Sequence, residues 1–233
     1  MLSIRDRLAQ IRTKISEAEY RYGRSPGSVS LLAVSKSQPL DRIQQAIACG
    51  QRLLGENYLQ QAQDKISKLH NSDLEWHFIG AIQANKTRHI AQLFQWVHSV
   101  DRLKIATRLN NQRPTTLPPL DLCLQVNVSE EPSKAGVRLE RLPELAEQIA
   151  ALSRLRLRGL MAIPFPSTST HDQRHNFALL REALEGINNR GFQLDTLSMG
   201  MSNDMEAAIA EGATMVRIGT AVFGPRPQKI ERH

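Results

Sequence analysis

A lysine follows an apolar segment at the point where a buried strand would open towards a loop. Residues 29–34 are apolar or small and predict a strand, Lys36 comes after them, and Pro39 marks the start of a helix. A lysine in this place can extend its amine to solvent or pair with a carboxylate. Alternatively, burial and cationic neighbours favour the unprotonated amine, which forms Schiff bases with aldehydes. Lys36 is therefore a candidate for attaching a carbonyl compound.

Two short segments near the C-terminus are rich in small residues, as anion-binding loops are. Ser198, Gly200 and Ser202 lie just before a predicted helix, and Gly219 and Thr220 follow the last apolar segment. Small residues let backbone N–H groups approach an anion, and a helix N-terminus adds partial positive charge. Either pattern alone is also typical of an ordinary turn. Together they predict a site for a ligand that carries a phosphate.

Arg217 lies inside the apolar segment 214–219. A buried guanidinium needs a partner because it does not readily lose its charge. The partner could be a carboxylate of the fold, or a ring nitrogen or anion of a ligand. An amine for an aldehyde, loops for a phosphate and an arginine for a ring nitrogen match pyridoxal 5′-phosphate (PLP).

The elements that must position these residues alternate along the chain as short apolar strands and amphipathic helices. A leading helix starts after Ser3, with apolar residues at helical spacing. The segments predicted as strands are 29–35, 53–55, 75–80, 96–100, 120–128, 155–163, 194–200 and 214–219. Eight strand-then-helix units in 233 residues predict an α/β fold, a single (β/α)8 TIM-type barrel with an added N-terminal helix. A doubly wound open sheet is the alternative.

One domain is expected over residues 1–233, with 1–28 as the N-terminal helix and lead-in and 225–233 as a C-terminal tail. In a barrel of this type the chemistry sits where strands end and helices begin. Lys36 follows the first predicted strand and Asn57 the second, and the small-residue segments follow the seventh and eighth. These residues are therefore expected on one rim of the barrel.

Composition narrows the classes of partner. The formal net charge is +7, which favours anionic partners. Aromatic residues, however, make up only 5% of the chain, and no basic tract is interleaved with them. We therefore expect no nucleic-acid partner. No apolar run approaches about 18 residues, and no secretory signal opens the chain, so no membrane association and a cytoplasmic location are expected. Cys49 and Cys123 lack metal or redox spacing and are interpreted as reduced core residues.

Several longer motifs resemble a known family. They are LLAVSKSQP, GENYLQ, WHFIGAIQANK, QVNVSEEPSKAG, LRGLMAIP and LSMGMSNDMEAAIAEGATMVRIGTAVFG. Over about Ser30 to Gly224 the chain resembles the YggS/PROSC family of pyridoxal phosphate homeostasis proteins. The resemblance implies a PLP-bound (β/α)8 barrel similar to the N-terminal domain of alanine racemase.

The resemblance also implies roles for individual residues. Lys36 would hold PLP as a covalent aldimine, and Arg217 would meet the pyridine nitrogen. The phosphate would be held by Ser198, Gly219 and Thr220, with Met201 and Ser202 beside it, while Asn57 and Lys134 would be further members of the site. Many family members carry a second lysine two places after the first, where this chain has Gln38. A PLP-transfer role for that lysine is not carried over.

Two classes of function remain open. The first, which we favour, is a PLP-binding protein in vitamin B6 homeostasis, an expected monomer that buffers PLP or delivers it to PLP-dependent apo-enzymes without efficient catalysis. The second is a PLP-dependent amino-acid racemase or lyase. A further alternative, aldolase chemistry at Lys36 without a cofactor, would leave Arg217 without a role. An arginine at the ring nitrogen makes a poor electron sink. Racemisation also needs a base on each face of the substrate, and the sequence offers no clear second one.

Overall fold

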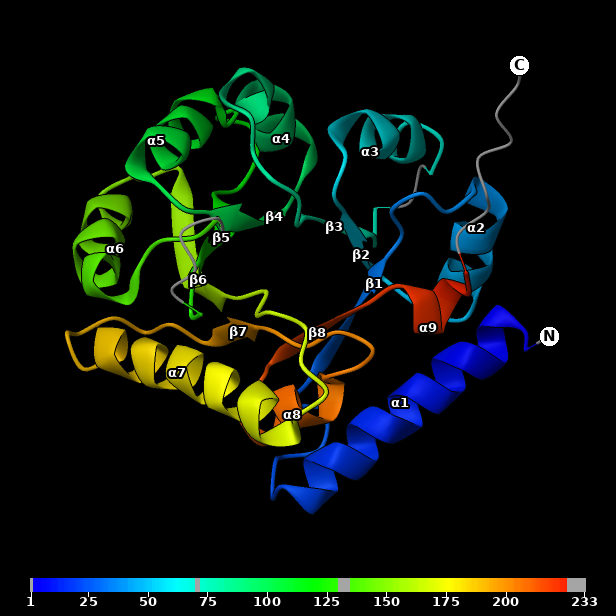
Figure 1. Ribbon diagram of the computed structural model, residues 1–233. Coiled ribbons are helices and arrows are strands. Elements are labelled where there is room, and N and C mark those ends of the chain that lie inside the picture. Colours follow the sequence, from blue (N-terminus) through cyan, green and yellow to red (C-terminus); the bar gives the residue numbers. More distant parts are fainter. Residues whose placement is uncertain (1, 70–71, 130–134, 226–233) are drawn as a thin grey trace, which may run out of the picture.

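Eight parallel strands close into a barrel in chain order, because β8 pairs with β1 (Figure 1). The computed structural model describes residues 2–69, 72–129 and 135–225. The strands are β1 Ser30–Val34, β2 Leu53–Glu56, β3 Glu75–Phe78, β4 Trp96–Val100, β5 Leu120–Gln125, β6 Leu155–Met161, β7 Thr196–Ser198 and β8 Met215–Ile218. The predicted (β/α)8 barrel is confirmed, and the open sheet is excluded.

Helices surround the barrel (Figure 1). They are α1 Ile4–Arg21, α2 Leu40–Ala48, α3 Leu59–Ile66, α4 Thr87–Leu93, α5 Leu103–Gln112, α6 Leu142–Ala150, α7 Thr170–Asn188, α8 Met205–Ala210 and α9 Thr220–Phe223, with short 3-10 helices η1 Ala84–Lys86 and η2 Leu139–Arg141. Most elements are shorter than predicted because their ends turn into loops. Within the described part of the chain, no helix has the length and apolarity to span a membrane.

The added N-terminal helix α1 begins where the sequence predicts. The Ser3 hydroxyl accepts from the Asp6 amide, and the Asp6 carboxylate accepts from the Ser3 amide, which forms a capping box. Its apolar residues are buried, and α1 packs along α8, α9 and α2 on the outside of the barrel (Figure 1). The helix therefore covers the side of the barrel where β8 meets β1.

Alternate residues of each strand face different layers. Leu31 and Ala33 of β1 join the main apolar core between the sheet and the helices. Leu32 and Val34 face the other way and pack with Ile79 inside the barrel. The barrel interior also contains buried polar side chains, which are candidates for the functional site.

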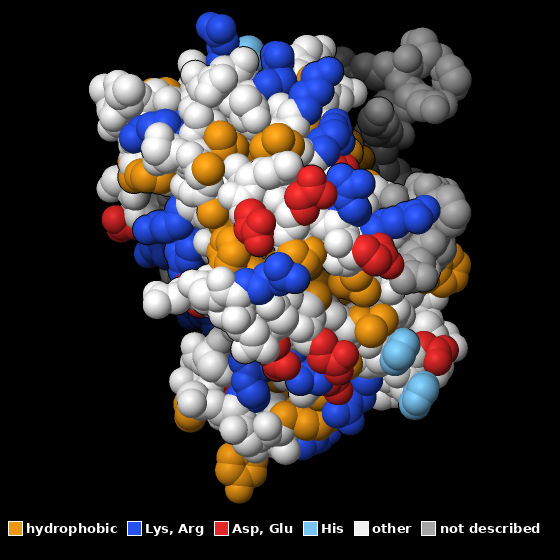
Figure 2. Space-filling model, turned by 90° about the vertical axis from the view of Figure 1, so that its left-hand side faces the viewer, with side chains coloured by type: hydrophobic (Ala, Val, Ile, Leu, Met, Phe, Trp, Pro, Cys, Tyr) orange, Lys and Arg blue, Asp and Glu red, His pale blue; other side chains and the backbone are white. Residues whose placement is uncertain are grey.

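Charged groups are mixed on the outer surface. Figure 2 shows lysine and arginine side chains interleaved with aspartate and glutamate on one face of the molecule. Typical pairs are Arg141 with Glu144, at 3.0 Å, and Arg181 with Glu185, at 3.2 Å. On this face the basic charge is distributed among acidic neighbours and forms no single continuous patch.

Candidate functional site

The predicted site residues gather on one sector of the barrel's carboxyl rim. Strands β7, β8, β1 and β2 are consecutive neighbours around the barrel. Lys36 follows β1, Asn57 follows β2, and Gly219 follows β8. Gly219 lies so close to β1 that a Cβ placed on it would stand 3.3 Å from the Val34 carbonyl oxygen. The topology therefore places residues from four strands around one rim sector.

Lys36 occupies a tight turn. The Ser35 amide donates to the Gly55 carbonyl at 2.9 Å, and the Gln38 amide donates back to the Ser35 carbonyl at 3.0 Å. Ser37 has a φ of +58°, in the left-handed region that few residues other than glycine adopt. Lys36 itself is half-buried. The turn holds the lysine backbone at the mouth of the barrel.

Arg217 is the buried cation of the site. Its side chain lies within the barrel at 4% exposure, and burial lowers its pKa to about 10, which leaves it charged at neutral pH. The guanidinium donates to the Ser198 hydroxyl at 2.9 Å, to the Ala162 carbonyl at 2.8 Å and to the Ser198 carbonyl. Among the described residues, no carboxylate lies within ion-pair distance of it. The arginine is thus held by neutral acceptors alone.

A hydrogen-bonded chain leads from Arg217 through the barrel interior. Ser198 Oγ lies 2.8 Å from His98 Nδ1, and His98 Nε2 lies 2.9 Å from His77 Nδ1. His77 Nε2 then lies 3.0 Å from the Glu75 carboxylate at the other end of the barrel. Burial lowers the pKa of both histidines, well below the usual value for His98, so both are neutral at pH 7.

The two ends of this chain assign its protons. Arg217 can only donate and an ionised Glu75 can only accept, so each group between them donates towards Glu75. His98 is then protonated on Nε2, and His77 is also protonated on Nε2. The reverse direction would set an unprotonated ring nitrogen against a carboxylate. The interior chain therefore connects Arg217 in one consistent direction to the amino end of the barrel.

The small-residue loops after β7 and β8 contain backbone amides that form no hydrogen bond with another described residue. Gly200 has a φ of +91°, and a Cβ on it would stand 2.6 Å from the Ala208 Cβ. The Gly200 carbonyl accepts from the Arg217 amide at 2.9 Å, and the Met201 amide donates to Asp204 Oδ1 at 2.5 Å. The amides of Ser202 and Thr220 donate to no other described residue. These two amides are available for an anion.

The predicted residues do not all lie in the same surroundings. Met201, Ser202 and Thr220 are exposed on the rim, whereas Ser198 is fully buried and bonded to Arg217 and His98. Ser198 therefore faces the interior chain rather than the loops beside it. Its assignment to the phosphate stays a prediction. Lys134 lies outside the described residues.

Buried polar atoms without partners cluster at this rim. Gln38 Oε1, Glu56 Oε2 and Asn57 Oδ1 are all buried and accept no hydrogen bond from the described protein. Native proteins seldom leave such atoms unsatisfied without a reason. Three of them close to the Lys36 turn fit a site that is completed by a polar ligand.

Four functional candidates were missed in the sequence: Glu56, Lys65, His77 and His98. The histidines gave the same signal as Arg217, a polar residue inside an apolar strand. Glu56 ends β2 directly before Asn57, and its carboxylate forms a buried ion pair with Lys65 of α3 at 2.6 Å. Nothing in the spacing indicated that pair, since it joins a strand end to the far end of the following helix.

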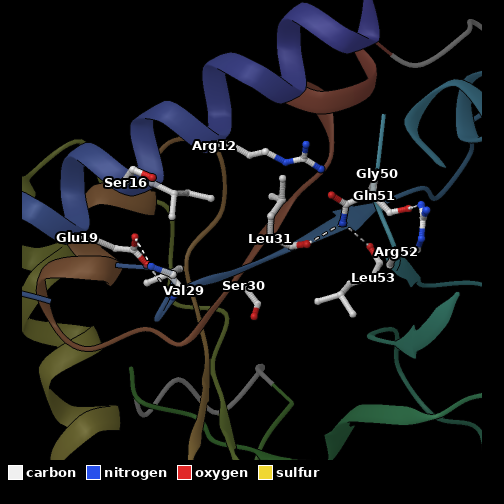
Figure 3. A pocket seen from close by; sticks show the side chains of 12 residues that line it. Arg12, Ser16, Glu19, Val29, Ser30, Leu31, Gly50, Gln51, Arg52 and Leu53 are labelled. Atoms are coloured by element: carbon white, nitrogen blue, oxygen red, sulfur yellow. Dashed lines mark hydrogen bonds between the residues drawn. The ribbon is translucent and has the colours of Figure 1, made fainter. Parts of the chain in front are cut away.

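A separate hollow of about 310 Å³ lies at the amino end of the barrel, between α1 and the starts of β1 and β2 (Figure 3). Its polar side chains already bind the chain's own backbone. Glu19 accepts from the Val29 amide at 2.8 Å, and Gln51 donates to the Leu31 and Leu53 carbonyls at 2.8 and 2.9 Å (Figure 3). The hollow lies away from the carboxyl rim and shows no unpaired buried group among its described residues.

Comparison with known proteins defines the class. Residues 7–227 match the family model of the alanine racemase N-terminal domain. A solved alanine racemase from Corynebacterium glutamicum has a TM-score of 0.71 over 98% of this chain and 63% of its own, at 15% identity, which shows the shared fold alone. The protein is thus a barrel of the alanine racemase N-terminal type.

Closer relatives define the family within that class. The chain is 58% identical to the pyridoxal phosphate homeostasis protein of Pseudomonas aeruginosa, over 97% of both chains. It is 54% identical to the protein of the same name from Escherichia coli, over 97% of this chain and 98% of the relative. The structure of PipY from Synechococcus elongatus with PLP bound has a TM-score of 0.84 at 38% identity, covering 95% of this chain and 100% of PipY. The chain belongs to the family of pyridoxal phosphate homeostasis proteins.

Proposed function

We propose that this protein binds PLP at the carboxyl rim and serves PLP homeostasis by buffering or delivering it. The observation that carries the proposal is Arg217, a buried cation near the rim without a carboxylate partner among the described residues. The family and the PLP-bound relative support the choice of ligand. When bound, PLP would supply an aldehyde for a lysine, a pyridine nitrogen and a phosphate.

The residues present fit such a group. We assign the aldehyde to Lys36 and the ring nitrogen to Arg217. The unpartnered Asn57 Oδ1 offers a buried acceptor, and the close approach of Gly219 to Val34 leaves a cradle that a side chain would fill. The open amides of Ser202 and Thr220, with Ser198 and Met201 nearby, are assigned to the phosphate side.

We further propose that efficient catalysis is absent. With a pKa of about 10, Arg217 remains a donor at neutral pH, so a ring nitrogen that accepts from it stays unprotonated and stabilises a carbanion poorly. Racemisation would also need a second base. The Tyr58 side chain is 56% exposed on the rim, and its hydroxyl makes no hydrogen bond to another described residue that could activate it.

The binding proposal is tested by locating the covalent bond. The purified protein is expected to be yellow with PLP, and borohydride reduction followed by peptide mass spectrometry should place the label on Lys36. Unphosphorylated pyridoxal should bind weaker by orders of magnitude, since charge-assisted hydrogen bonds are worth about 1.5–3 kcal/mol each. A label mainly on another lysine, or equal affinity for both ligands, would contradict the site.

The absence of catalysis is tested separately. The loaded protein is incubated with single-enantiomer amino acids in D2O, and deuterium at Cα is followed together with the opposite enantiomer. We expect neither at rates typical of enzymes, because each missing 1.4 kcal/mol or so of transition-state stabilisation costs tenfold in rate. Turnover at such rates would favour the racemase or lyase alternative.

The oligomeric state, the location and the recipients of PLP are also part of the proposal. We propose a single-domain monomer in the cytoplasm that passes PLP to PLP-dependent apo-enzymes. Light scattering with size-exclusion chromatography reports the oligomeric state directly. Transfer is measured by the activity that a PLP-free enzyme regains when mixed with the loaded protein, compared with free PLP at the same concentration.

A further inference from the structure

Helix α3 binds the backbone on both sides of Lys36. Gln61 Oε1 accepts from the Ser37 amide at 3.0 Å, and Lys65 Nζ donates to the Ser35 carbonyl at 2.7 Å. Gln61 and Lys65 are four residues apart, so they share one face of the helix. One helix face thus holds residues 35 and 37, the neighbours of Lys36.

The same lysine neutralises a buried carboxylate beneath the turn. Lys65 Nζ lies 2.6 Å from Glu56 Oε1, which also accepts from the Ser35 hydroxyl at 2.6 Å. Glu56 is fully buried, and its Oε2 atom has no partner. Burial raises the pKa of Glu56, and the charges of Lys65 and Lys36 and the Ser35 hydroxyl oppose that rise.

Two lysines therefore oppose the rise in the pKa of Glu56: Lys65 from α3 and Lys36 from the turn after β1. Theirs are the largest charge effects on its pKa. A carboxylate with Lys36 as its sole counter-ion would hold that amine as an ammonium, which is not a nucleophile. With Lys65 in place, the negative charge of Glu56 is already balanced.

We propose that Lys65 is a positioning residue for Lys36: it fixes the turn through Ser35 and supplies the charge that Glu56 would otherwise take from the Lys36 amine. The inference rests on the proposed role of Lys36 as the PLP-binding amine. According to this proposal, the Glu56–Lys65 pair affects the reactivity of the Lys36 amine. An ion pair that only stabilised the fold would not have that effect.

The test uses the PLP-free protein. A lysine-acylating reagent is applied at a series of pH values, and mass spectrometry follows the rate at Lys36. Lys65→Met leaves Glu56 to act on Lys36, so the midpoint of the rate profile should move up by about one pH unit, a roughly tenfold slower rate at neutral pH. Glu56→Gln leaves the Lys65 charge unbalanced, so the midpoint should move down.

Matched variants complete the design. The double variant Lys65→Met with Glu56→Gln removes both charges and should return the midpoint towards that of the parent. Lys65→Arg keeps the charge and should stay close to the parent. Lys68 is exposed just beyond the same helix, and Lys68→Met should leave the profile unchanged.

Opposite shifts for the two single variants support the proposal, and unchanged midpoints in folded variants overturn it. If Lys65→Met does not fold, Glu56→Gln decides alone: a downward shift supports the proposal, and no shift overturns it. Failure of the proposed function is recognised independently, because the reduced PLP label in the parent protein would then map away from Lys36 whatever the acylation profile shows.

Discussion

The two ends of the barrel differ in how they satisfy their buried acceptor oxygens. At the amino end, Asp121 binds Arg156 and Arg158, Arg158 also binds Asp195 at 2.6 Å, and its guanidinium lies 5.0 Å above the Trp96 ring. At the carboxyl end, Gln38, Glu56 and Asn57 each keep a buried oxygen without a partner. Among the described residues, the amino end leaves Arg154 Nε without a partner but no buried side-chain oxygen, whereas the buried side-chain oxygens without a partner lie at the carboxyl end.

The difference indicates that the polar groups of the two ends serve different purposes. Barrels of this type carry chemistry at the carboxyl end and stability at the amino end. Here the interior chain Arg217–Ser198–His98–His77–Glu75 joins the two ends. Outside this chain, changes to the ion pairs at the amino end should alter stability with little effect on PLP, because the pairs lie away from the carboxyl rim, and changes at that rim should do the reverse.

The largest effect is expected from acidification, which acts on the interior chain. His77 and His98 have pKa values below 6.5 in the folded state because of burial, whereas unfolding restores ordinary histidines. The unfolded state then binds more protons below pH 6.5, so folding stability is full above that pH and falls beneath it. Each histidine contributes a slope of up to about 1.4 kcal/mol per pH unit.

Chemical unfolding at several pH values between about 7 and 5 measures that slope. The His98→Gln variant keeps a donor and an acceptor and should lose one histidine's share of the slope. His171 is exposed, and His171→Gln should leave the slope as it is. A parent slope near zero in this range would show that the chain is not neutral as described.

The next effect is expected at the amino end. Asp121→Asn removes the charge that Arg156 and Arg158 share, and should cost about 2 kcal/mol, below the usual figure for a fully buried pair because both arginines are partly exposed. Urea unfolding measures the loss, with the exposed Glu140→Gln as control. PLP affinity should stay within about twofold; a larger loss would show that the two ends are not separable.

Two asparagines compare the ends directly. Asn188 is paired, since its side chain donates to the Leu194 carbonyl at 2.9 Å and accepts from the Leu194 amide at 2.8 Å. Asn188→Ala should cost about 1–2 kcal/mol and leave PLP binding intact. Asn57→Ala removes an unpartnered oxygen and should cost less than about 0.5 kcal/mol while weakening PLP about tenfold. Parallel urea and PLP titrations of both variants test the contrast, and similar profiles would refute it.

The barrel and its two conspicuous cations were predictable from the sequence. Eight apolar segments, each followed by a helical one, leave few other topologies. Lys36 and Arg217 stand out because a charge in an apolar strand is costly. His77 and His98 gave the same kind of signal, but a neutral histidine is less costly to bury, so it indicated function less strongly.

The surroundings of Ser198 could not be read from the sequence. Parallel strands buried on both faces lack a polar–apolar alternation that reveals which residues point into the barrel. The register pairs Ser198 with Met215, two residues before Arg217, and so sets both Ser198 and Arg217 on the interior face. The Glu56–Lys65 pair depends likewise on how α3 docks against the end of β2, which spacing alone does not specify.

The smallest effect is expected for two buried glutamines, one at each end. Gln51 at the amino end has both of its amide hydrogens used by backbone carbonyls (Figure 3), whereas Gln38 has a buried oxygen without a partner. Methionine has nearly the same shape and no strong acceptor. Gln51→Met strands two carbonyls and should destabilise the protein by about 1 kcal/mol.

Gln38→Met should do the opposite. Removing an unsatisfied buried oxygen should leave the stability of the PLP-free protein unchanged or raise it by up to about 1 kcal/mol. If that oxygen serves the site, PLP should bind a few-fold weaker at the same time, a trade between stability and function that we do not expect for Gln51 at the amino end. Urea unfolding without PLP and PLP titration measure the two quantities. A loss of stability equal to that of Gln51→Met would mean that Gln38 is as fully bonded in solution as its counterpart, and the distinction between the ends would then rest on Glu56 and Asn57 alone.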